Sequence, residues 1–165
     1  MASSNRTSFG ARTRKHADAI ALLKADHRQV EVWFSQFSKS KQARKKQQLA
    51  VQICDALTVH TAIEEEIFYP AFIEATGDRD THHEAVIEHG AAKKLIAEIQ
   101  SMSPDDDYYD AKVTVLSEMI KHHVKEEEQP GGMFSEAKKS DMDLQTLGQQ
   151  LRARKQQLQA TAQAA

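Results

Sequence analysis

Cysteine, proline and glycine are scarce in this sequence of 165 residues, which holds one cysteine, three prolines and six glycines. The single cysteine, Cys54, excludes a disulfide within the chain, and its apolar neighbours Ile53 and Leu57 predict a buried, reduced thiol, as is typical of cytoplasmic proteins. Few prolines and glycines leave long stretches without helix breakers. Because Leu, Ile, Ala, Glu, Lys and Gln dominate the rest, the composition favours an all-α domain.

Long apolar runs are also absent. No stretch approaches the length of a membrane span, and the first fourteen residues lack the apolar segment of a secretory signal. We therefore expect a soluble, cytoplasmic protein without a membrane partner. The length suits one domain with a substantial core.

Positive charge is concentrated at the start of the chain, where residues 1–47 carry eleven Lys or Arg against three acidic residues. The densest part, 39–46, has no interleaved aromatic residues and matches no nucleic-acid-binding module, so we interpret it as a solvated helix face and expect no nucleic-acid partner. Residues 1–15 are basic and nearly free of apolar side chains. They predict a disordered basic tail.

Apolar residues recur with the 3.6-residue period of an α-helix in four stretches, which are residues 17–37, 43–75, 81–102 and 104–128. Pro70 predicts a kink in the second helix, and Gly77 predicts its terminal cap. Ser103 is placed to cap the fourth helix, with Pro104 at its first position. Four long helices with short links predict an up-down-up-down four-helix bundle over residues 16–135.

Residues 136–165 predict a short C-terminal helix outside the bundle core. Asp141 is placed to cap it, and its apolar positions are Leu144, Leu147 and Leu151. The Gln- and Ala-rich end after Lys155 is expected to fray.

Each of the four predicted bundle helices carries one histidine on its apolar stripe, and two of them add a glutamate four residues later, on the same face. These candidate metal ligands are His27, His60, Glu64, His89, His123 and Glu127. A shift of 63 residues aligns the His60 to Glu64 motif with His123 to Glu127. A shift of 62 would pair His60 with His122 instead, but it breaks the apolar stripe.

A bundle would gather these six polar groups at one depth, where burial without compensation would cost several kcal/mol each. A bound cation offsets that cost. The alternative is a network of protonated histidines paired with Glu64 and Glu127, which requires imidazoles to hold protons in a low-dielectric site.

The ligand types favour two iron ions. Imidazole binds iron, zinc and copper, whereas carboxylates that bridge two ions are typical of paired iron or manganese in helix bundles. Six protein ligands are too many for a tetrahedral zinc ion with an open position. Two irons, oxo- or hydroxo-bridged and joined by Glu64 and Glu127, would leave room for a small molecule such as dioxygen, peroxide, nitric oxide or water.

The chain resembles the hemerythrin-like proteins with an HHE cation-binding domain over about residues 17–135. The resemblance rests on the following motifs: Asp26-His27, His60-x-x-x-Glu64-Glu65 running to Phe68-Tyr69-Pro70, Glu88-His89, and His123-x-x-x-Glu127-Glu128. It implies a non-haem di-iron centre with His27 and His60 on one iron, His89 and His123 on the other, and Glu64 and Glu127 as bridges.

The third predicted helix departs from the family pattern. Oxygen-carrying hemerythrins have two histidines four residues apart there, but the positions four residues from His89 are Ala85 and Lys93. One iron would then lack a ligand, which favours a more open, reactive or sensing centre over simple oxygen carriage. Glu31 is a candidate additional ligand, because it follows His27 by four residues. An ion pair between Glu31 and Lys93 is the equal alternative.

The remaining polar residues near these motifs are interpreted first as surface groups. They are His82, His83, His122, Glu65, Glu66, Glu126 and Glu128. The leading hypothesis is thus a di-iron protein that binds or senses dioxygen, nitric oxide or the iron and redox state of the cell. The alternatives are a di-iron enzyme that acts on peroxide and a bundle in which metal serves only as a structural staple, with any protein partner unknown.

Overall fold

The computed structural model describes residues 17–164, so the predicted tail at 1–15 lies outside the described residues. The described part is helical, with no strand among its residues. Its elements in chain order are α1 (Ala19–Lys39), α2 (Ala43–Ile63), a π-helical turn η1 (Glu64–Phe68), α3 (Tyr69–Thr76), α4 (Arg79–Gln100), α5 (Tyr109–Glu128), α6 (Met133–Lys139) and α7 (Leu144–Ala164).

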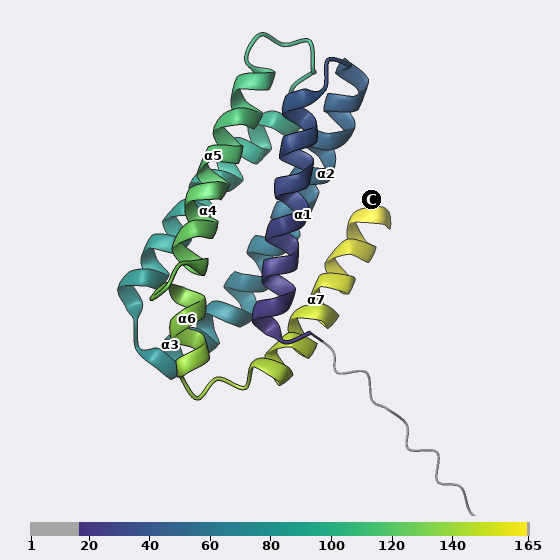
Figure 1. The fold of residues 1–165 in the computed structure, drawn as a ribbon. Coiled ribbons are helices and arrows are strands. Elements are labelled where there is room, and N and C mark those ends of the chain that lie inside the picture. The colour runs from purple at the N-terminus through teal and green to yellow at the C-terminus, as the bar shows by residue number, and fades with distance from the viewer. Residues whose placement is uncertain (1–16, 165) are drawn as a thin grey trace, which may run out of the picture.

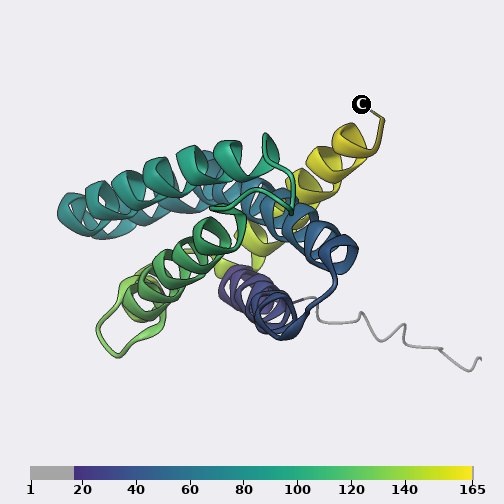
Figure 2. The same cartoon turned by 90° about the horizontal axis from the view of Figure 1, so that it is seen from above.

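The four long helices α1, α2, α4 and α5 form an up-down-up-down bundle, which confirms the predicted fold class (Figure 1). Helix α1 packs against α2 and α5, and α4 packs against the same two helices, so the four close into a ring. Helix α7 lies outside this ring, where it packs against α1 and α2 (Figure 2). None of the described helices is long and apolar enough to cross a membrane.

The core consists of two apolar clusters, one towards each end of the bundle. The first cluster contains Val30 and Leu57, and the second contains Leu23 and Ile63. Buried polar residues at positions 27 and 60 lie between these pairs in the sequence of α1 and α2. The bundle therefore holds a polar layer between two apolar layers.

The second predicted helix is divided by the π-helical turn η1. There the N–H of Tyr69 donates to the carbonyl of Glu64, five residues earlier, instead of to a carbonyl four residues earlier. Pro70 follows at the start of α3 and has no N–H to continue the regular ladder. Gly77 ends α3 with a φ of 71°, so the predicted glycine cap is confirmed.

Helix α5 begins at Tyr109, and the predicted start at Ser103 and Pro104 is wrong. Residues 103–108 form turns instead, because the backbone N–H of Ser103 donates to Asp106 Oδ2 at 2.7 Å and the N–H of Asp106 donates to the Ser103 carbonyl at 3.0 Å. These local bonds satisfy backbone groups that a helix would otherwise use. Tyr109 is then buried against Phe37 of α1.

Helix α7 is 21 residues long and continues past Lys155, where fraying was expected. Its cap is Asp143 and not Asp141, since Asp143 Oδ1 accepts the N–H of Thr146 at 3.0 Å. Leu151 is fully buried in the second apolar cluster. The helix lies outside the ring of four bundle helices, but it is docked on them and contributes Leu151 to the core, which the prediction of an appendage did not include.

Candidate metal centre

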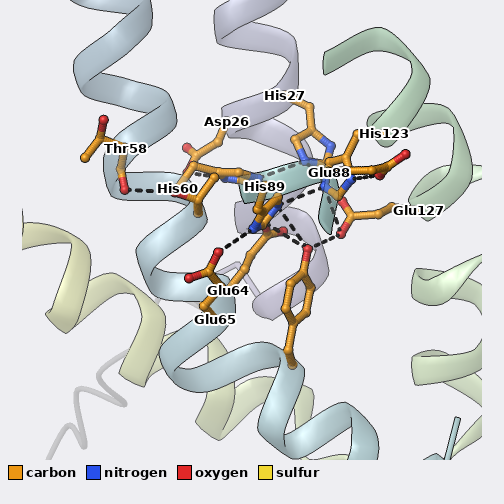
Figure 3. A network of polar contacts seen from close by, with 12 residues as sticks. Asp26, His27, Thr58, His60, Glu64, Glu65, Glu88, His89, His123 and Glu127 are labelled. Atoms are coloured by element: carbon orange, nitrogen blue, oxygen red, sulfur yellow. Dashed lines mark hydrogen bonds and ion pairs between the residues drawn. The ribbon is translucent and has the colours of Figure 1, made fainter. Parts of the chain in front are cut away.

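Four histidine side chains meet between the two apolar clusters, one from each bundle helix (Figure 3). His27 and His60 approach each other with their Nε2 atoms 3.0 Å apart, and the Nε2 atoms of His89 and His123 are 3.1 Å apart. All four are at most 6 % exposed. They form two pairs of inward-facing nitrogens.

Two buried carboxylates join the histidine pairs. Glu64 Oε2 lies 3.2 Å from His60 Nε2 and 3.4 Å from His89 Nε2. Glu127 lies 3.4 Å from His27 Nε2 and 3.5 Å from His123 Nε2, through its two different oxygens. Each carboxylate thus reaches one histidine of each pair, and the structure brings together all six residues that the sequence singled out.

Each histidine is held from the outside by a second carboxylate at its Nδ1 atom. The Nδ1 contacts are His27 to Glu128 at 2.8 Å, His60 to Asp26 at 3.4 Å, His89 to Glu65 at 3.0 Å and His123 to Glu88 at 2.6 Å. We call Asp26, Glu65, Glu88 and Glu128 the outer carboxylates. Because a carboxylate only accepts hydrogen bonds, we assign the proton of each ring to Nδ1, which leaves Nε2 with a lone pair in the neutral ring.

The outer carboxylates are themselves paired with basic side chains. Glu65 accepts from Lys93 at 2.6 Å, Glu128 accepts from Arg28 at 2.7 Å, and Asp26 accepts from Lys155 of α7. The prediction that Glu65 and Glu128 are solvated surface groups is therefore wrong. Glu66 and Glu126 do lie at the periphery, where they pair with Arg154 and His122.

Tyr69 also belongs to the centre, although the helical periodicity of the sequence did not indicate it. Its hydroxyl is 3.2 Å from His89 Nε2, 3.2 Å from Glu127 Oε1 and 3.5 Å from Glu64 Oε2. The ring is fully buried. Burial, together with the negative charge of Glu64, raises the pKa of Tyr69 well above its usual value of 10, so the hydroxyl keeps its proton.

The buried groups change one another's protonation. Burial lowers the pKa of His27 to about 4, and His60 adds to this fall. Burial acts in the same direction on His60, but Glu64 and Asp26 outweigh it and raise the pKa of His60 to about 10. Burial would raise the pKa of Glu64, yet His60 and His89 hold it well below its usual range. Burial and the charge of Glu64 raise the pKa of Glu127 to about 8.

The donor set fits metal ions. Two nitrogens bound to one ion at about 2.1 Å and near a right angle would be about 3.0 Å apart, which agrees with both Nε2 pairs. Glu64 Oε1 and Glu127 Oε2 are buried oxygens without a hydrogen-bond partner among the described residues. A cation would satisfy these oxygens and the facing lone pairs together, whereas a network of protonated histidines leaves Glu64 Oε1 unpaired.

The other candidates lie outside the cluster. Glu31 is 37 % exposed at its side chain and pairs with Arg28 at 3.3 Å, because it points to the surface of α1. It neither joins the six residues nor meets Lys93, which is bound to Glu65. His122 is an exposed partner of Glu88, at 3.3 Å. His82 packs against the ring of Tyr69 and does not reach the six residues.

A cavity of about 200 Å³ adjoins the centre. All four histidines line it, but Glu64, Glu127 and Tyr69 do not. It therefore reaches the centre from the imidazole side. The mouth contains residues of α7, Lys155 and Gln159.

Comparison with known proteins agrees with this geometry. Residues 18–130 match the model of the Hemerythrin HHE cation binding domain, so the chain belongs to this family of cation-binding helical bundles. The structure is similar to the crystal structure of a hemerythrin HHE cation binding domain-containing protein from Mycobacterium kansasii, a homologue of Rv2633c, with a TM-score of 0.73 over 90 % of this chain and 91 % of that one. At 22 % sequence identity, this likeness establishes the fold.

A curated relative is the DNA nickase of Nostoc sp. (strain PCC 7120 / SAG 25.82 / UTEX 2576), which is 31 % identical over 107 residues. The match covers 65 % of this chain but only 30 % of that protein. The family membership and the His and Glu clusters together support a metal-binding function.

Proposed function

We propose that the six inward residues hold two iron ions and that the centre binds or senses a small molecule such as dioxygen or nitric oxide, or the iron and redox state of its surroundings. The proposal rests on one observation: two pairs of histidines are joined by two carboxylates. His27 with His60 and His89 with His123 supply two separate nitrogen sites, and Glu64 and Glu127 each reach both. Carboxylates in this role are typical of paired iron in bundles.

Iron bound there would supply a centre that accepts a small exogenous ligand and exchanges electrons with it. The chain does the rest. The outer carboxylates fix the orientation of each ring through Nδ1 and raise the basicity of Nε2. The apolar clusters on either side keep bulk water from the polar layer. The cavity on the imidazole side gives a small molecule a path to the centre.

The third bundle helix supports an open centre. Lys93, one turn after His89, is 46 % exposed at its side chain and points away to Glu65. Ala85, one turn before His89, has no ligand atom and is buried in the second apolar cluster. The other α4 side chain at this pair, Glu88, contacts His123 only at Nδ1, so α4 supplies no second group beside the inward Nε2 atoms. This arrangement favours ligand binding or sensing at that side of the centre.

Elemental analysis with an absorption spectrum of the purified protein tests the proposal. We expect two irons per chain and near-ultraviolet bands of an oxo- or hydroxo-bridged ferric pair. His60→Ala should lose iron while the exposed control His83→Ala keeps it. One zinc ion per chain, or a fully folded protein that takes up no metal from iron-rich medium, would contradict the proposal and favour a structural bundle.

A second candidate function is the disproportionation of hydrogen peroxide to water and dioxygen. The observation in its favour is Tyr69, whose protonated hydroxyl lies 3.2 Å from His89 Nε2 beside the side of the centre that lacks a further ligand. Such a hydroxyl is placed to donate a hydrogen bond to a reacting oxygen that gains negative charge. Bound metal would polarise the peroxide.

Oxygen evolution from added peroxide by the iron-loaded protein distinguishes the two functions. Tyr69→Phe should retain iron and lose about 10²-fold or more of the rate, which is the usual contribution of one hydrogen-bond donor to a developing negative charge. An iron-loaded protein that evolves no oxygen would leave binding or sensing as the function.

A further inference from the structure

The cavity beside the centre is mainly apolar, although the centre itself is polar. Its apolar wall comes from α1, α2 and α5, and includes Val30, Trp33, Ala56, Leu57, Ile120 and Val124. These side chains surround a space that ends at the imidazole rings. The wall therefore offers hydrophobic contact to a molecule that lies next to the centre.

The cavity is larger than a diatomic ligand or peroxide requires. A cavity of about 150 Å³ in another protein holds a benzene ring and stays free of water when it is empty. The volume here is about 200 Å³. One aromatic ring with a small substituent fills such a space, and the ring of Trp33 in the wall offers it an edge or a face.

The charges at the mouth cancel. Lys155 and Asp26, the charged side chains at the mouth, are paired with each other. The remaining polar groups near the surface are the exposed amides of Gln29 and Gln159, which both donate and accept hydrogen bonds. A charged ligand therefore finds no unpaired charge at the mouth, whereas a ligand with a hydroxyl or carbonyl group can form a hydrogen bond with one of these amides.

We propose that this cavity is a binding site for a small uncharged aromatic molecule with one hydroxyl or carbonyl substituent, bound with its ring against Trp33 and its polar end towards Gln29 and Gln159. The site consists of the protein's own side chains. It deepens the proposed function, because an organic ligand would then lie directly beside the metal centre, but it does not require the metal to be iron.

The fluorescence of Trp33 tests the proposal, because it is the only tryptophan of the chain. The protein as purified, with its metal content measured, is titrated with benzyl alcohol, and the heat of binding is recorded in parallel. We expect saturable binding of one molecule per chain and at least tenfold weaker binding of benzylammonium, which has the same ring and a positive charge. No saturable signal, or equal binding of benzylammonium, would overturn the proposal.

Two variants locate the site. Ala56→Phe fills the cavity and should weaken the binding of benzyl alcohol at least tenfold, whereas the control Val51→Phe, at a 51 % exposed position of the same helix, should leave it unchanged. Unchanged binding by Ala56→Phe would overturn the proposal. If Ala56→Phe does not fold, Gln159→Ala at the exposed mouth replaces it. That variant should weaken the binding of benzyl alcohol several-fold but leave the binding of toluene, which has no hydroxyl group, unchanged. Equal effects on the two ligands would contradict the assigned orientation.

Metal content and ring binding are separate readouts. A protein that contains no iron but binds benzyl alcohol refutes only the proposed function. A protein with two irons that does not bind it refutes only the cavity assignment.

Discussion

Each imidazole of the centre is fixed at both of its nitrogens. Nε2 points inward to its partner ring, and Nδ1 is held by an outer carboxylate, which in turn contacts a basic side chain such as Lys93, Arg28 or Lys155. Such chains of hydrogen bonds determine which nitrogen carries the proton and prevent ring rotation. The outer carboxylates should therefore influence metal affinity although they do not face the centre.

Replacing Glu88 by alanine tests this influence. Glu88 accepts from His123 Nδ1 at 2.6 Å, so its loss should release the ring and lower metal affinity about 10- to 100-fold. Competition with a chelator of known affinity measures the change. The matched control is Glu98→Ala on the same helix, since Glu98 pairs only with Lys112 at the surface. Equal affinities of the two variants would show that Glu88 has no orienting role.

The sequence predicted the inward residues better than the outer ones. His27, His60, His89 and His123 interrupt apolar stripes, and helical periodicity alone places them inside. The outer carboxylates contact histidines of other helices: Asp26, next to His27 in α1, reaches His60 in α2. Such contacts depend on how neighbouring helices are rotated and offset, which a periodic pattern within one helix does not specify.

At the scale of the element, the π-helical turn explains why Tyr69 was missed. Five residues correspond to about 140° of rotation around an α-helix, so a regular helix would point Tyr69 away from Glu64. The extra residue in the turn brings the hydroxyl of Tyr69 to within 3.5 Å of Glu64 instead. Pro70 predicted an irregularity in the second helix. It did not predict that the irregularity lies before the proline, or that it is a π-helical turn with one extra residue.

Helix α7 docks through a close backbone contact at Gly148. A Cβ atom at this position would lie 2.8 Å from the backbone N of Ala19 at the start of α1. Gly148→Ala should therefore destabilise the protein by about 1–3 kcal/mol, the usual cost of overpacking, despite the higher helix propensity of alanine. Chemical denaturation measures the difference. The control is Gly90→Ala in α4, where an added Cβ atom would have no described atom within 4 Å apart from its chain neighbours and the adjacent backbone of its own helix, and a gain of about 0.5–1 kcal/mol is expected.

The start of α4 should give a pH-dependent contribution to stability. Hydrogen bonds from the hydroxyl and backbone N–H of Thr81 hold the pKa of Asp78 below its usual 3.8. A carboxylate with a lowered pKa stabilises the native state above its unfolded pKa, and this contribution is lost as the pH falls through the folded pKa. Asp78→Ala should cost about 1 kcal/mol at pH 7, and the difference from the unmodified protein should shrink below about pH 4.

Denaturation curves of both proteins between pH 3 and pH 7 measure this dependence. Asp80→Ala is the control, because Asp80 is exposed in the same helical turn and its side chain makes no hydrogen bond to the described residues. Asp80→Ala should change the stability at pH 7 less than Asp78→Ala does. An Asp78→Ala difference that does not change with pH would contradict the capping role.

At the scale of the whole molecule, the centre is a polar layer that separates two apolar clusters. Metal removal should weaken the fold, because Glu64 Oε1 and Glu127 Oε2 would then stay buried without a hydrogen-bond partner among residues 17–164. A ligand present at a thousand times its Kd stabilises a protein by about 4 kcal/mol. For a chain of this size, the loss of this stabilisation corresponds to a fall in Tm of roughly 8–16 °C when a chelator removes the metal.

Thermal unfolding with and without a chelator, at constant pH, measures this fall. His60→Ala has one candidate ligand fewer, so its Tm should respond much less to the chelator. An unmodified protein whose Tm is the same with and without bound metal would show that the bundle does not depend on the cation.

One carboxylate oxygen of Asp26 accepts a hydrogen bond from Lys155 of α7, and the other oxygen lies 3.4 Å from His60 Nδ1. Asp26 therefore takes part in two equilibria, the docking of α7 on the bundle and the binding of metal at the centre. Thermodynamic linkage requires that any coupling between them be reciprocal. If metal tightens the attachment of α7, then whatever detaches α7 lowers the affinity for metal by the same factor. Amide hydrogen exchange in α7 would report on the state of the centre from the surface of the molecule.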